Sequence, residues 1–464
     1  MKSQSNLVNV TRQHDSQTLN GATTHSTSLN NVLDMFFLAG ASRTMSEQDI
    51  IILWEKAKSE DLNMAVKCLF WARDCRGGAG EKRFFRVIIS HLMKSDPELY
   101  GWITIFIPDF GSWKDIFLTE NPTADNLDWI SRALTERDDN LCAKWFPRRG
   151  KWFSAMYKHL NMTPKGFRKL LVGMTRVVET QMCAKKFDEI EFSKVPSKAF
   201  HIYKKSFAKQ DPERFTKFVE AVNEGAEKVN SGQLFPYELY QSFMKGDAHD
   251  VIKAQWNNLP DYVGEGSFLP VCDVSGSMNG LPMEVSVSLG VYLSERNKSV
   301  FKDAFITFTG KPEMQYLQGD VIQRFSQLRR AHWEMNTNLQ AVFRLILDKA
   351  VTNSLPQSDM PGTVIIISDM EFDEACPGLT NFELIQERYS QAGYTMPKLI
   401  FWNVNGRIGN VPVSADQSNV GLVSGASPAI VKSVLSGKDF TPVGVMKEVL
   451  NSERYKQVTS FIER

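Results

Sequence analysis

The chain has 464 residues, of which 42% are hydrophobic and 23% are charged, and its formal net charge is +1. This length predicts two or three domains, and the composition is typical of a soluble globular protein. No segment approaches the roughly eighteen consecutive apolar residues of a transmembrane helix, so the sequence predicts no membrane span.

The first 27 residues are rich in Ser, Thr, Asn and Gln and contain no apolar segment of the secretory kind. This composition predicts a disordered polar tail over residues 1–27. The six cysteines form no CxxC pair, which argues against a zinc site, and their scatter suits a reducing compartment. We therefore expect a cytoplasmic protein.

Between about residues 28 and 258 the apolar side chains recur mostly at helical spacing. The segment that begins at Leu29 follows the i, i+3, i+4, i+7 pattern of an amphipathic helix. Ser46, which precedes an acidic turn, and Thr163, which precedes a proline, are typical helix N-caps. A succession of short helices without strands predicts an all-α helical repeat domain over 28–258, although the sequence shows no clear repeat period.

Positive charge is concentrated within this helical half. Residues 142–209 hold sixteen Lys and Arg against four Asp and Glu, a net charge of +12. Around Trp145 and Trp152 the cations alternate with aromatic residues, and RNA binding uses cations against phosphates and aromatic rings against unpaired bases. The alternative is a solvated helix face with both tryptophans in the core. The candidate RNA-binding residues are Lys144, Arg148, Arg149, Lys151, Lys165, Arg168, Lys169, Lys185 and Lys186.

After a turn-rich linker near residues 260–266 the hydrophobic period changes. Strand-like runs alternate with helical ones, which predicts a second domain over 266–464 with an open parallel sheet covered by helices on both faces. The expected strands are 268–274, 300–308, 363–368 and 398–404, and the expected helices are 282–296, 338–351, 382–391, 428–435 and 442–450.

Two of the expected strands end in an aspartate, Asp273 and Asp369. Ligands of open α/β sheets bind beyond the carboxyl ends of the strands. Asp273 opens a loop in which Ser275 and Ser277 place two hydroxyls on one side, and the glycine between them permits a tight turn. Carboxylates, hydroxyls and water suit Mg²⁺ or Mn²⁺ better than Zn²⁺. The alternative is a turn in which these residues act only as caps.

On these residues the second domain resembles von Willebrand factor A (vWA) domains, which have a Rossmann-like fold and a metal-ion-dependent adhesion site. Asp273, Ser275 and Ser277 are similar to the DxSxS motif of that family, and Asp369 is similar to its final aspartate. Thr337, at the start of an expected helix, is similar to the threonine that supplies a further ligand. The resemblance implies that these five residues bind Mg²⁺ or Mn²⁺.

The helical half resembles the TROVE-type proteins of the Ro ribonucleoprotein group. Residues 71–83 (WARDCRGGAGEKR) are similar to the RD…RGG-x-G-x-R segment of that group, and residues 107–116 and 178–188 are similar to further segments of its plant, viral and bacterial relatives. The resemblance implies a ring of HEAT-like helical repeats closed by the vWA domain. It also implies RNA as the ligand, with RNA ends in the ring and structured RNA on its basic outer face.

Catalysis finds little support in the sequence. The seven histidines form no HExxH motif, and no GxSxG nucleophile motif is present. The acidic residues Glu371, Asp373 and Glu374 near the expected metal could hold a second ion, as in two-metal phosphoryl chemistry, or form a rim that faces a partner. We expect a protein that is not an enzyme.

Three functions therefore stay open. The first is an RNA-binding, Ro-like ribonucleoprotein component with a divalent-metal vWA module. The second is a metal-dependent protein-interaction scaffold, in which a partner such as an AAA+ ATPase donates an acidic residue to the metal, as the resemblance to chelatase-type and MoxR-type vWA proteins implies. The third is a metal-dependent nuclease or phosphatase.

Overall fold

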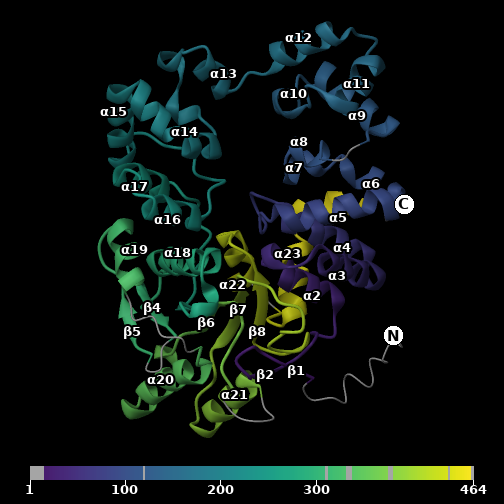
Figure 1. Ribbon diagram of the computed structural model, residues 1–464. Helices are drawn as coiled ribbons and strands as arrows, with labels where there is room; N and C mark the ends of the chain where they lie inside the picture. Colours follow the sequence, from purple (N-terminus) through teal and green to yellow (C-terminus); the bar gives the residue numbers. More distant parts are fainter. Residues whose placement is uncertain are drawn as a thin grey trace.

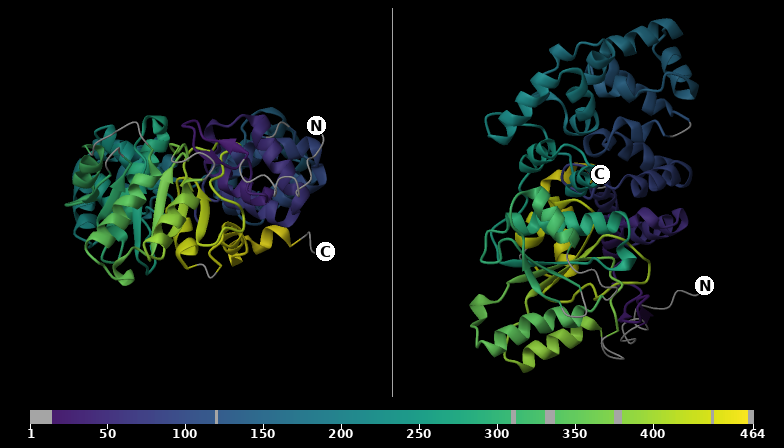
Figure 2. Two further views of the ribbon diagram at one scale, coloured as in Figure 1. Left: turned by 90° about the horizontal axis from the view of Figure 1, so that it is seen from below. Right: turned by 60° about the vertical axis from the view of Figure 1, so that its left-hand side comes forward.

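The chain forms a helical arm and a unit built on a six-stranded sheet, and the arm leaves one side of this sheet unit and returns to the other (Figure 1). The computed structural model describes residues 15–118, 121–308, 312–330, 337–374, 380–436 and 439–460. The predicted order, a helical half followed by a mainly parallel sheet half, is confirmed. The expectation that the helical half curves back onto the sheet half is also met (Figures 1 and 2).

In the described part of 28–258, all the regular elements are helices, and neighbouring helices pack on one another along the arm. Their bounds are α2 Asn31–Ala39, α3 Glu47–Glu60, α4 Leu62–Arg73, α5 Lys82–Ser95, α6 Pro97–Thr104, α7 Ile107–Phe110, α8 Trp113–Ile116, α9 Ala124–Thr135, α10 Asn140–Trp145, α11 Gly150–His159, α12 Pro164–Met174, α13 Val178–Cys183, α14 Ser197–Gln210, α15 Pro212–Asn223, α16 Pro236–Met244 and α17 His249–Asn257.

Local signals in the sequence explain where these helices begin. The Ser46 hydroxyl accepts from the Asp49 backbone N–H at 3.1 Å, and the Thr163 hydroxyl accepts from the Gly166 N–H at 3.0 Å. Each bond satisfies one of the backbone donors that a helix N-terminus leaves free. The first helices then bury large aromatic side chains such as Trp54 and Trp71, neither of which is exposed to solvent.

The sheet has the strand order β5-β4-β3-β6-β7-β8, in which only the described pair β4–β5 is antiparallel. β3 and β6 pair directly, with Val271 opposite Ile366 and Cys272 opposite Ile367. The strand bounds are β3 Phe268–Cys272, β4 Ala304–Thr307, β5 Met314–Tyr316, β6 Thr363–Ser368, β7 Lys398–Asn403 and β8 Val420–Ser424. β3, β6 and β8 are buried along their whole length, as strands covered on both faces must be.

Helices lie on both sides of the sheet, with α18 on one side and α20 and α21 on the other (Figures 1 and 2). All the expected strands and helices are present, with ends that differ from the predicted ones by at most four residues, and β5, β8, α19 and α24 were not predicted. The helices are α18 Leu281–Arg296, α19 Val321–Arg330, α20 Leu339–Thr352, α21 Asn381–Gln391, α22 Val431–Ser436, α23 Pro442–Leu450 and α24 Glu453–Lys456. Among the described residues, no helix has the length and apolar character needed to cross a bilayer.

One large hydrophobic cluster includes residues of both halves, and a second, smaller cluster lies among the later helices of the arm. At one end of the arm α2 packs on β8, where the Ser424 hydroxyl donates to the Phe36 carbonyl at 2.8 Å and accepts from the Gly40 N–H at 3.0 Å. At the other end α16 packs on α18, and α17 packs on α19. The arm is therefore anchored to the sheet unit at both of its ends (Figure 1).

The predicted disordered tail needs a correction. Residues 15–27 are ordered: β1 (Ser16–Gln17) and β2 (Thr23–Thr24) form a small hairpin that lies on the sheet unit. Gly21 forms a bridge with Asp373, and His25 forms one with Val411. Polar composition predicted disorder because it offers little apolar area, but hydroxyl and amide side chains stabilise this segment through long-range hydrogen bonds. Residues 1–14 lie outside the described part of the chain.

Candidate metal centre and nucleic-acid interface

The sheet brings the two predicted aspartates together. Because β3 and β6 are parallel neighbours, their carboxyl ends lie at the same edge, and each strand is followed directly by one of the aspartates, Asp273 and Asp369. The Asp273 backbone N–H still donates to the Ile367 carbonyl at 2.9 Å, so the ladder continues to the first residue of the loop. This register fixes both carboxylates at one edge.

Asp273 is fully buried and tightly held. One carboxylate oxygen accepts from the Ser275 backbone N–H at 2.9 Å, and the other accepts from the Ser368 hydroxyl at 2.5 Å. Burial raises the pKa of Asp273 to about 6, and the nearby charge of Asp369 adds to this rise. A buried carboxylate with a raised pKa is one that a cation would stabilise in its charged form.

The hydroxyls of the loop face the second carboxylate. The Ser275 and Ser277 oxygens lie 3.1 Å apart, and Ser277 donates to the Asp369 carboxylate. Burial raises the pKa of Asp369, although this hydrogen bond opposes the rise. Four of the five predicted metal-binding residues are thus joined in one network.

Thr337, the fifth residue, is held against the loop that follows β6. Its backbone N–H donates to the Asp373 carboxylate at 2.9 Å, and its carbonyl accepts from the Asp373 N–H at 3.1 Å. Its hydroxyl is buried and has no hydrogen-bond partner among the described residues. A buried hydroxyl without a partner fits a hard cation as the missing partner.

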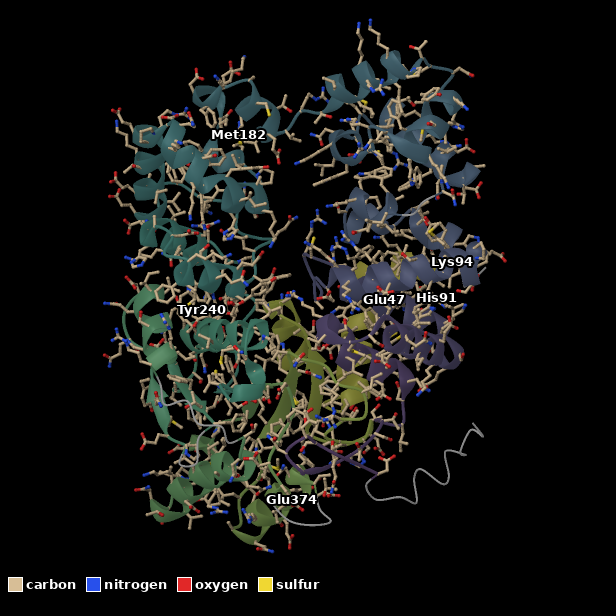
Figure 3. The ribbon with its side chains drawn as sticks, viewed as in Figure 1. Glu47, His91, Lys94, Met182, Tyr240 and Glu374 are labelled. Atoms are coloured by element: carbon tan, nitrogen blue, oxygen red, sulfur yellow. The ribbon has the colours of Figure 1, made fainter. Side chains whose placement is uncertain are left out.

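Two of the acidic residues that follow Asp369, Glu371 and Asp373, already have hydrogen-bond or ion-pair partners in the chain. These contacts argue against a second metal ion at this position. The Glu371 carboxylate accepts from the Leu19 N–H at 2.5 Å and from the Asn410 amide at 3.1 Å, and lies 3.4 Å from the Arg407 guanidinium. Asp373 is engaged by Thr337 as described above. Glu374 is exposed (Figure 3). The rim residues therefore shape the loop more than they offer free ligands.

The candidate RNA-binding residues lie on α10, α11 and α12, in the loop between α10 and α11, and directly after α13, at the far end of the arm from the sheet (Figure 1). Two of them are engaged in ion pairs, Lys144 with Glu179 at 2.8 Å and Lys186 with Glu189 at 2.7 Å. The other seven are exposed, and the described residues give them no carboxylate partner. These are Arg148, Arg149, Lys151, Lys165, Arg168, Lys169 and Lys185, hereafter the arm cations.

The two tryptophans of this segment differ in burial. Trp152 is 4% exposed and packs edge-on against Phe117 in the core, so it cannot stack on a base. Trp145 is 40% exposed and lies between the ammonium groups of Lys114 and Lys144, which are 5.5 and 5.2 Å from its ring centre. Only Trp145 of this pair remains a candidate for stacking on a base.

Sequence reasoning missed a basic cavity of about 910 Å³ where α3 and α5 face the start of α16. Burial, with the like charges of Arg73 and Lys198, lowers the pKa of Lys82 on its wall, which shows how densely positive charge is placed there. Figure 3 labels Glu47, His91 and Lys94 on the same helices. The charge-rich segment 73–83, which contributes Lys82 and Arg83 to the lining, was the sequence feature that could have indicated this cavity. The lining cations are Arg43, Lys82, Arg83, Arg86, Lys94 and Lys198.

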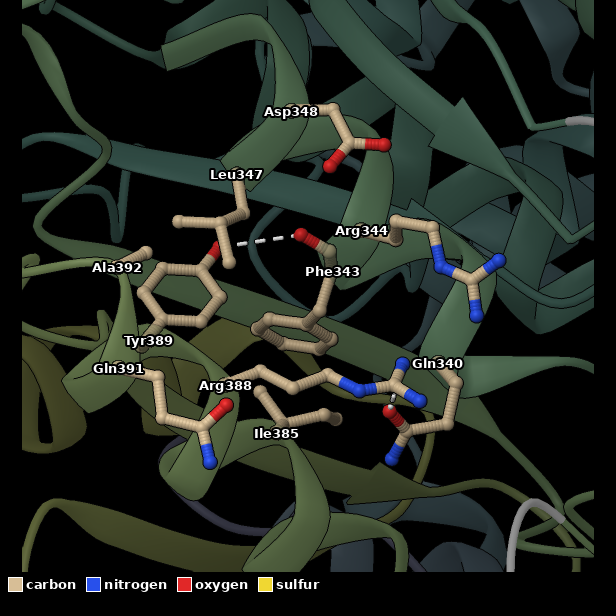
Figure 4. Close-up of a pocket in the computed structure, with 10 residues that line it drawn as sticks. All are labelled: Gln340, Phe343, Arg344, Leu347, Asp348, Ile385, Arg388, Tyr389, Gln391 and Ala392. Atoms are coloured by element: carbon tan, nitrogen blue, oxygen red, sulfur yellow. Dashed lines mark hydrogen bonds between the residues drawn. The ribbon is translucent and has the colours of Figure 1, made fainter. Parts of the chain in front are cut away.

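A second hollow, a groove of about 500 Å³ between α20 and α21, begins one helical turn after Thr337 (Figure 4). Its floor contains the buried side chains of Phe343, Ile385 and Tyr389. Arg344 and Arg388 stand beside it, and the Arg388 guanidinium donates to the Gln340 side chain at 3.1 Å (Figure 4). The groove thus joins an apolar floor to two cations.

Two family models match separate parts of the chain. A family model described as "Domain of unknown function (DUF7788)" matches residues 267–461, and one described as "Domain of unknown function (DUF2828)" matches residues 154–267. The "Uncharacterized protein L728" of Acanthamoeba polyphaga mimivirus is 28% identical over 497 residues, which covers 93% of this chain and 86% of that protein.

Among solved structures, the Ro (RSR) protein of Deinococcus radiodurans aligns over 90% of this chain and 92% of its own, with 11% identity and a TM-score of 0.34. A TM-score of this size establishes neither a shared fold nor a shared function.

Proposed function

We propose that the chain is an RNA-binding protein of the Ro-like kind whose helical arm binds single-stranded or partly structured RNA. The observation that carries the proposal is the set of seven exposed arm cations without a carboxylate partner. Paired cations are already neutralised, whereas unpaired ones gain most from phosphate. The half-exposed Trp145 ring adds a surface on which a base can stack. The similarity of residues 71–83 to TROVE-type proteins supports the same ligand.

The basic cavity gives further support because it extends the positive surface to a second part of the arm. Its wall carries six cations together with the aromatic side chains Phe235 and Tyr237. Glu81 and Glu238 neutralise only Arg43 and Lys198 among those six, and Asp115 pairs with Arg86. An anionic chain with exposed bases matches this combination of groups.

Filter binding of an unstructured single-stranded RNA tests the proposal. The logarithm of the affinity should fall linearly with the logarithm of salt concentration, by roughly 0.7 for each phosphate contact. Replacing Arg148 and Arg149 together with Ala should lower this slope by about one to two units and weaken binding to all sequences alike. Arg329→Ala with Arg330→Ala, an exposed pair at the end of α19, is the matched control. An absence of RNA affinity at low salt would refute the proposal.

We further propose that the sheet edge binds Mg²⁺ or Mn²⁺. Ser275, Ser277 and Thr337 would hold the ion with their hydroxyls, and Asp273 and Asp369 would hold it directly or through water. The bound ion would act as a Lewis acid with one position open to a partner's carboxylate. The orphaned Thr337 hydroxyl is the observation that supports this proposal most directly.

A second candidate function, a metal-dependent protein-interaction scaffold, is supported by the groove between α20 and α21. The groove begins beside Thr337 and would offer an apolar floor and two guanidiniums to a partner whose acidic residue reaches the metal. Retention of a partner protein that is lost with EDTA and in Asp273→Ala, while RNA affinity persists, would favour this function. RNA affinity with no metal-dependent partner would favour the first.

A further inference from the structure

The N-terminal hairpin is fastened to the loop that carries the candidate metal ligands. We define the strap as residues 16–24 and the metal loop as residues 369–374. The Thr18 hydroxyl donates to the Phe372 carbonyl at 2.7 Å, and the Asn20 amide donates to the Glu371 carbonyl at 2.7 Å. The Leu19 backbone N–H donates to the Glu371 carboxylate at 2.5 Å. More than 350 positions separate the two segments along the chain.

The metal loop joins two candidate ligands through its own backbone. Asp369 stands at its first position and accepts from the Glu371 N–H at 3.2 Å. Near its end, Asp373 pairs with the Thr337 backbone in both directions. A change in the shape of residues 370–373 therefore moves Asp369 relative to Thr337.

The same loop contains a backbone conformation that needs support. Met370 has φ of +66°, a left-handed value that is unfavourable for a residue with a side chain. The Asn410 amide donates to the Met370 carbonyl at 3.0 Å from one side, and the strap bonds the next two residues from the other. Strained backbone persists where the surroundings over-determine it. The strap is one of the groups that do so here, together with Asn410 and with the Ser368 hydroxyl, which accepts from the Met370 N–H at 3.0 Å.

We propose that the strap is a positioning element of the metal centre, in which Thr18 and Asn20 hold the metal loop in its ligand-bearing shape. The inference rests on the proposed metal centre. Residues that orient metal ligands through hydrogen bonds without touching the ion typically contribute about 10–100-fold to metal affinity. The strap is in direct contact with neither the Asp273 carboxylate nor the serine hydroxyls among the contacts described, so its effect passes through the loop.

The test compares Thr18→Val and Asn20→Ala in the full chain with Ser26→Ala as the matched control. Ser26 lies just beyond the strap, and its hydroxyl donates to the exposed Asp15 carboxylate, so the control removes a hydroxyl from the same segment without touching the metal loop. Calorimetric titration with Mn²⁺ should show about 10–100-fold weaker binding in the two strap variants and unchanged binding in the control.

Hydrogen exchange of the metal-free proteins provides a readout that does not depend on the ion. The amides of Glu371 and Asp373 should exchange about fivefold faster in the strap variants, because one net hydrogen bond is worth about 1 kcal/mol. Equal Mn²⁺ affinity with equal exchange rates would overturn the strap inference alone. Wild-type protein that binds neither Mn²⁺ nor Mg²⁺ would overturn the metal centre, and unchanged exchange would then overturn the strap as well. Faster exchange without metal binding would leave the strap as a support of the loop and remove its role toward a metal.

Discussion

At the scale of single residues, the segment 73–83, which resembles a motif of RNA-binding proteins, forms buried ion pairs and hydrogen bonds with distant parts of the chain. Arg73 is 3% exposed and pairs with the fully buried Asp115 at 2.8 Å, and Arg86 pairs with the other oxygen of Asp115, also at 2.8 Å. The adjacent Asp74 is buried as well and accepts from the Arg454 guanidinium and, at 3.0 Å, from the Tyr455 hydroxyl. The motif therefore joins the start of the arm to its middle and to the last helices of the chain.

The Asp115 pair gives the first prediction. Asp115→Ala should lower the free energy of unfolding by about 3–5 kcal/mol, because it leaves a buried guanidinium without its counter-ion. Urea unfolding followed by circular dichroism measures this loss. Arg176→Ala breaks an ion pair with Asp138 in which both side chains are more than half exposed, and it should change stability by less than about 0.5 kcal/mol. Equal losses in the two variants would contradict the prediction.

The sequence predicted that two aspartates follow neighbouring parallel strands, and the sheet confirms this placement. Asp273 and Asp369 follow apolar runs whose strand character is unambiguous, and parallel neighbours bring their carboxyl ends together. Thr18 and Asn20, which donate hydrogen bonds to the loop after Asp369, could not be predicted. The sequence of a polar N-terminal segment does not indicate which loop that segment contacts. The sequence also could not predict that Trp152 is buried and Trp145 is exposed. Both lie in one basic segment, and only the packing of α8 and α11 distinguishes them.

At the scale of elements, caps and periodicity predicted the long helices and the buried strands, and the missing elements are those with weak local signals. β5 has three residues and is only partly buried, so it shows no apolar run. β8 has a glycine at its second position and lies in a segment that otherwise reads as a loop, and its burial depends on α2 and α23. These elements are specified by contacts that are distant along the chain.

The contact between α2 and β8 gives a prediction about packing. A Cβ at Gly40 would lie 2.6 Å from the Ser424 carbonyl oxygen, which is backbone and cannot move aside easily. Gly40→Ala should therefore destabilise the protein by roughly 1–3 kcal/mol. Gly101, in the interior of α6, has no atom within 4 Å of its ideal Cβ, so Gly101→Ala should stabilise the protein by about 0.5–1 kcal/mol. Thermal unfolding measures both shifts, and shifts of the same sign would contradict the argument.

The contact between α14 and the end of α16 gives a prediction about pH. Burial alone raises the pKa of Asp247, but ion pairs with Lys205 and Lys204, whose ammonium nitrogens lie 2.7 and 2.9 Å from its carboxylate oxygens, outweigh it and hold that pKa well below its ordinary value. A folded-state pKa below the unfolded one means that the ionised carboxylate stabilises the fold at neutral pH. This contribution is lost progressively as the pH falls below about 4, because the unfolded chain then takes up a proton at Asp247, whereas the folded chain takes it up only at lower pH.

Asp247→Asn should accordingly lower the melting temperature at pH 7, and the difference from wild type should shrink as the pH is reduced toward 3. Melting curves recorded across this range test the sign. Asp250→Asn, at a side chain that is 77% exposed, is the control and should follow wild type throughout. A difference that stays constant or grows with acid would show that Asp247 is not the titrating group.

At the scale of the whole molecule, both ends of the helical arm pack on the sheet unit (Figure 1). The first arm helix, α2, contacts β8, and the last two, α16 and α17, contact α18 and α19. One hydrophobic core runs through both halves, so the sheet unit and the base of the arm should unfold together. The last turns of the chain reinforce this closure through Arg454 and Tyr455 on Asp74. The arm cations lie at the opposite end of the arm from the sheet edge that carries the candidate metal ligands (Figures 1 and 2).

This separation gives the last prediction, that metal binding and RNA binding are independent. Asp273→Ala removes a carboxylate from the metal centre and should abolish Mn²⁺ binding in calorimetry. It should leave RNA affinity and its salt dependence unchanged, because an ion at the sheet edge is screened from the arm cations beyond a Debye length of about 10 Å. Arg148→Ala with Arg149→Ala should do the reverse. If Mn²⁺ or its removal by EDTA changed RNA affinity in wild type but not in Asp273→Ala, the two sites would be coupled through the shared core. If the change also occurred in Asp273→Ala, the ion would be acting on the RNA itself.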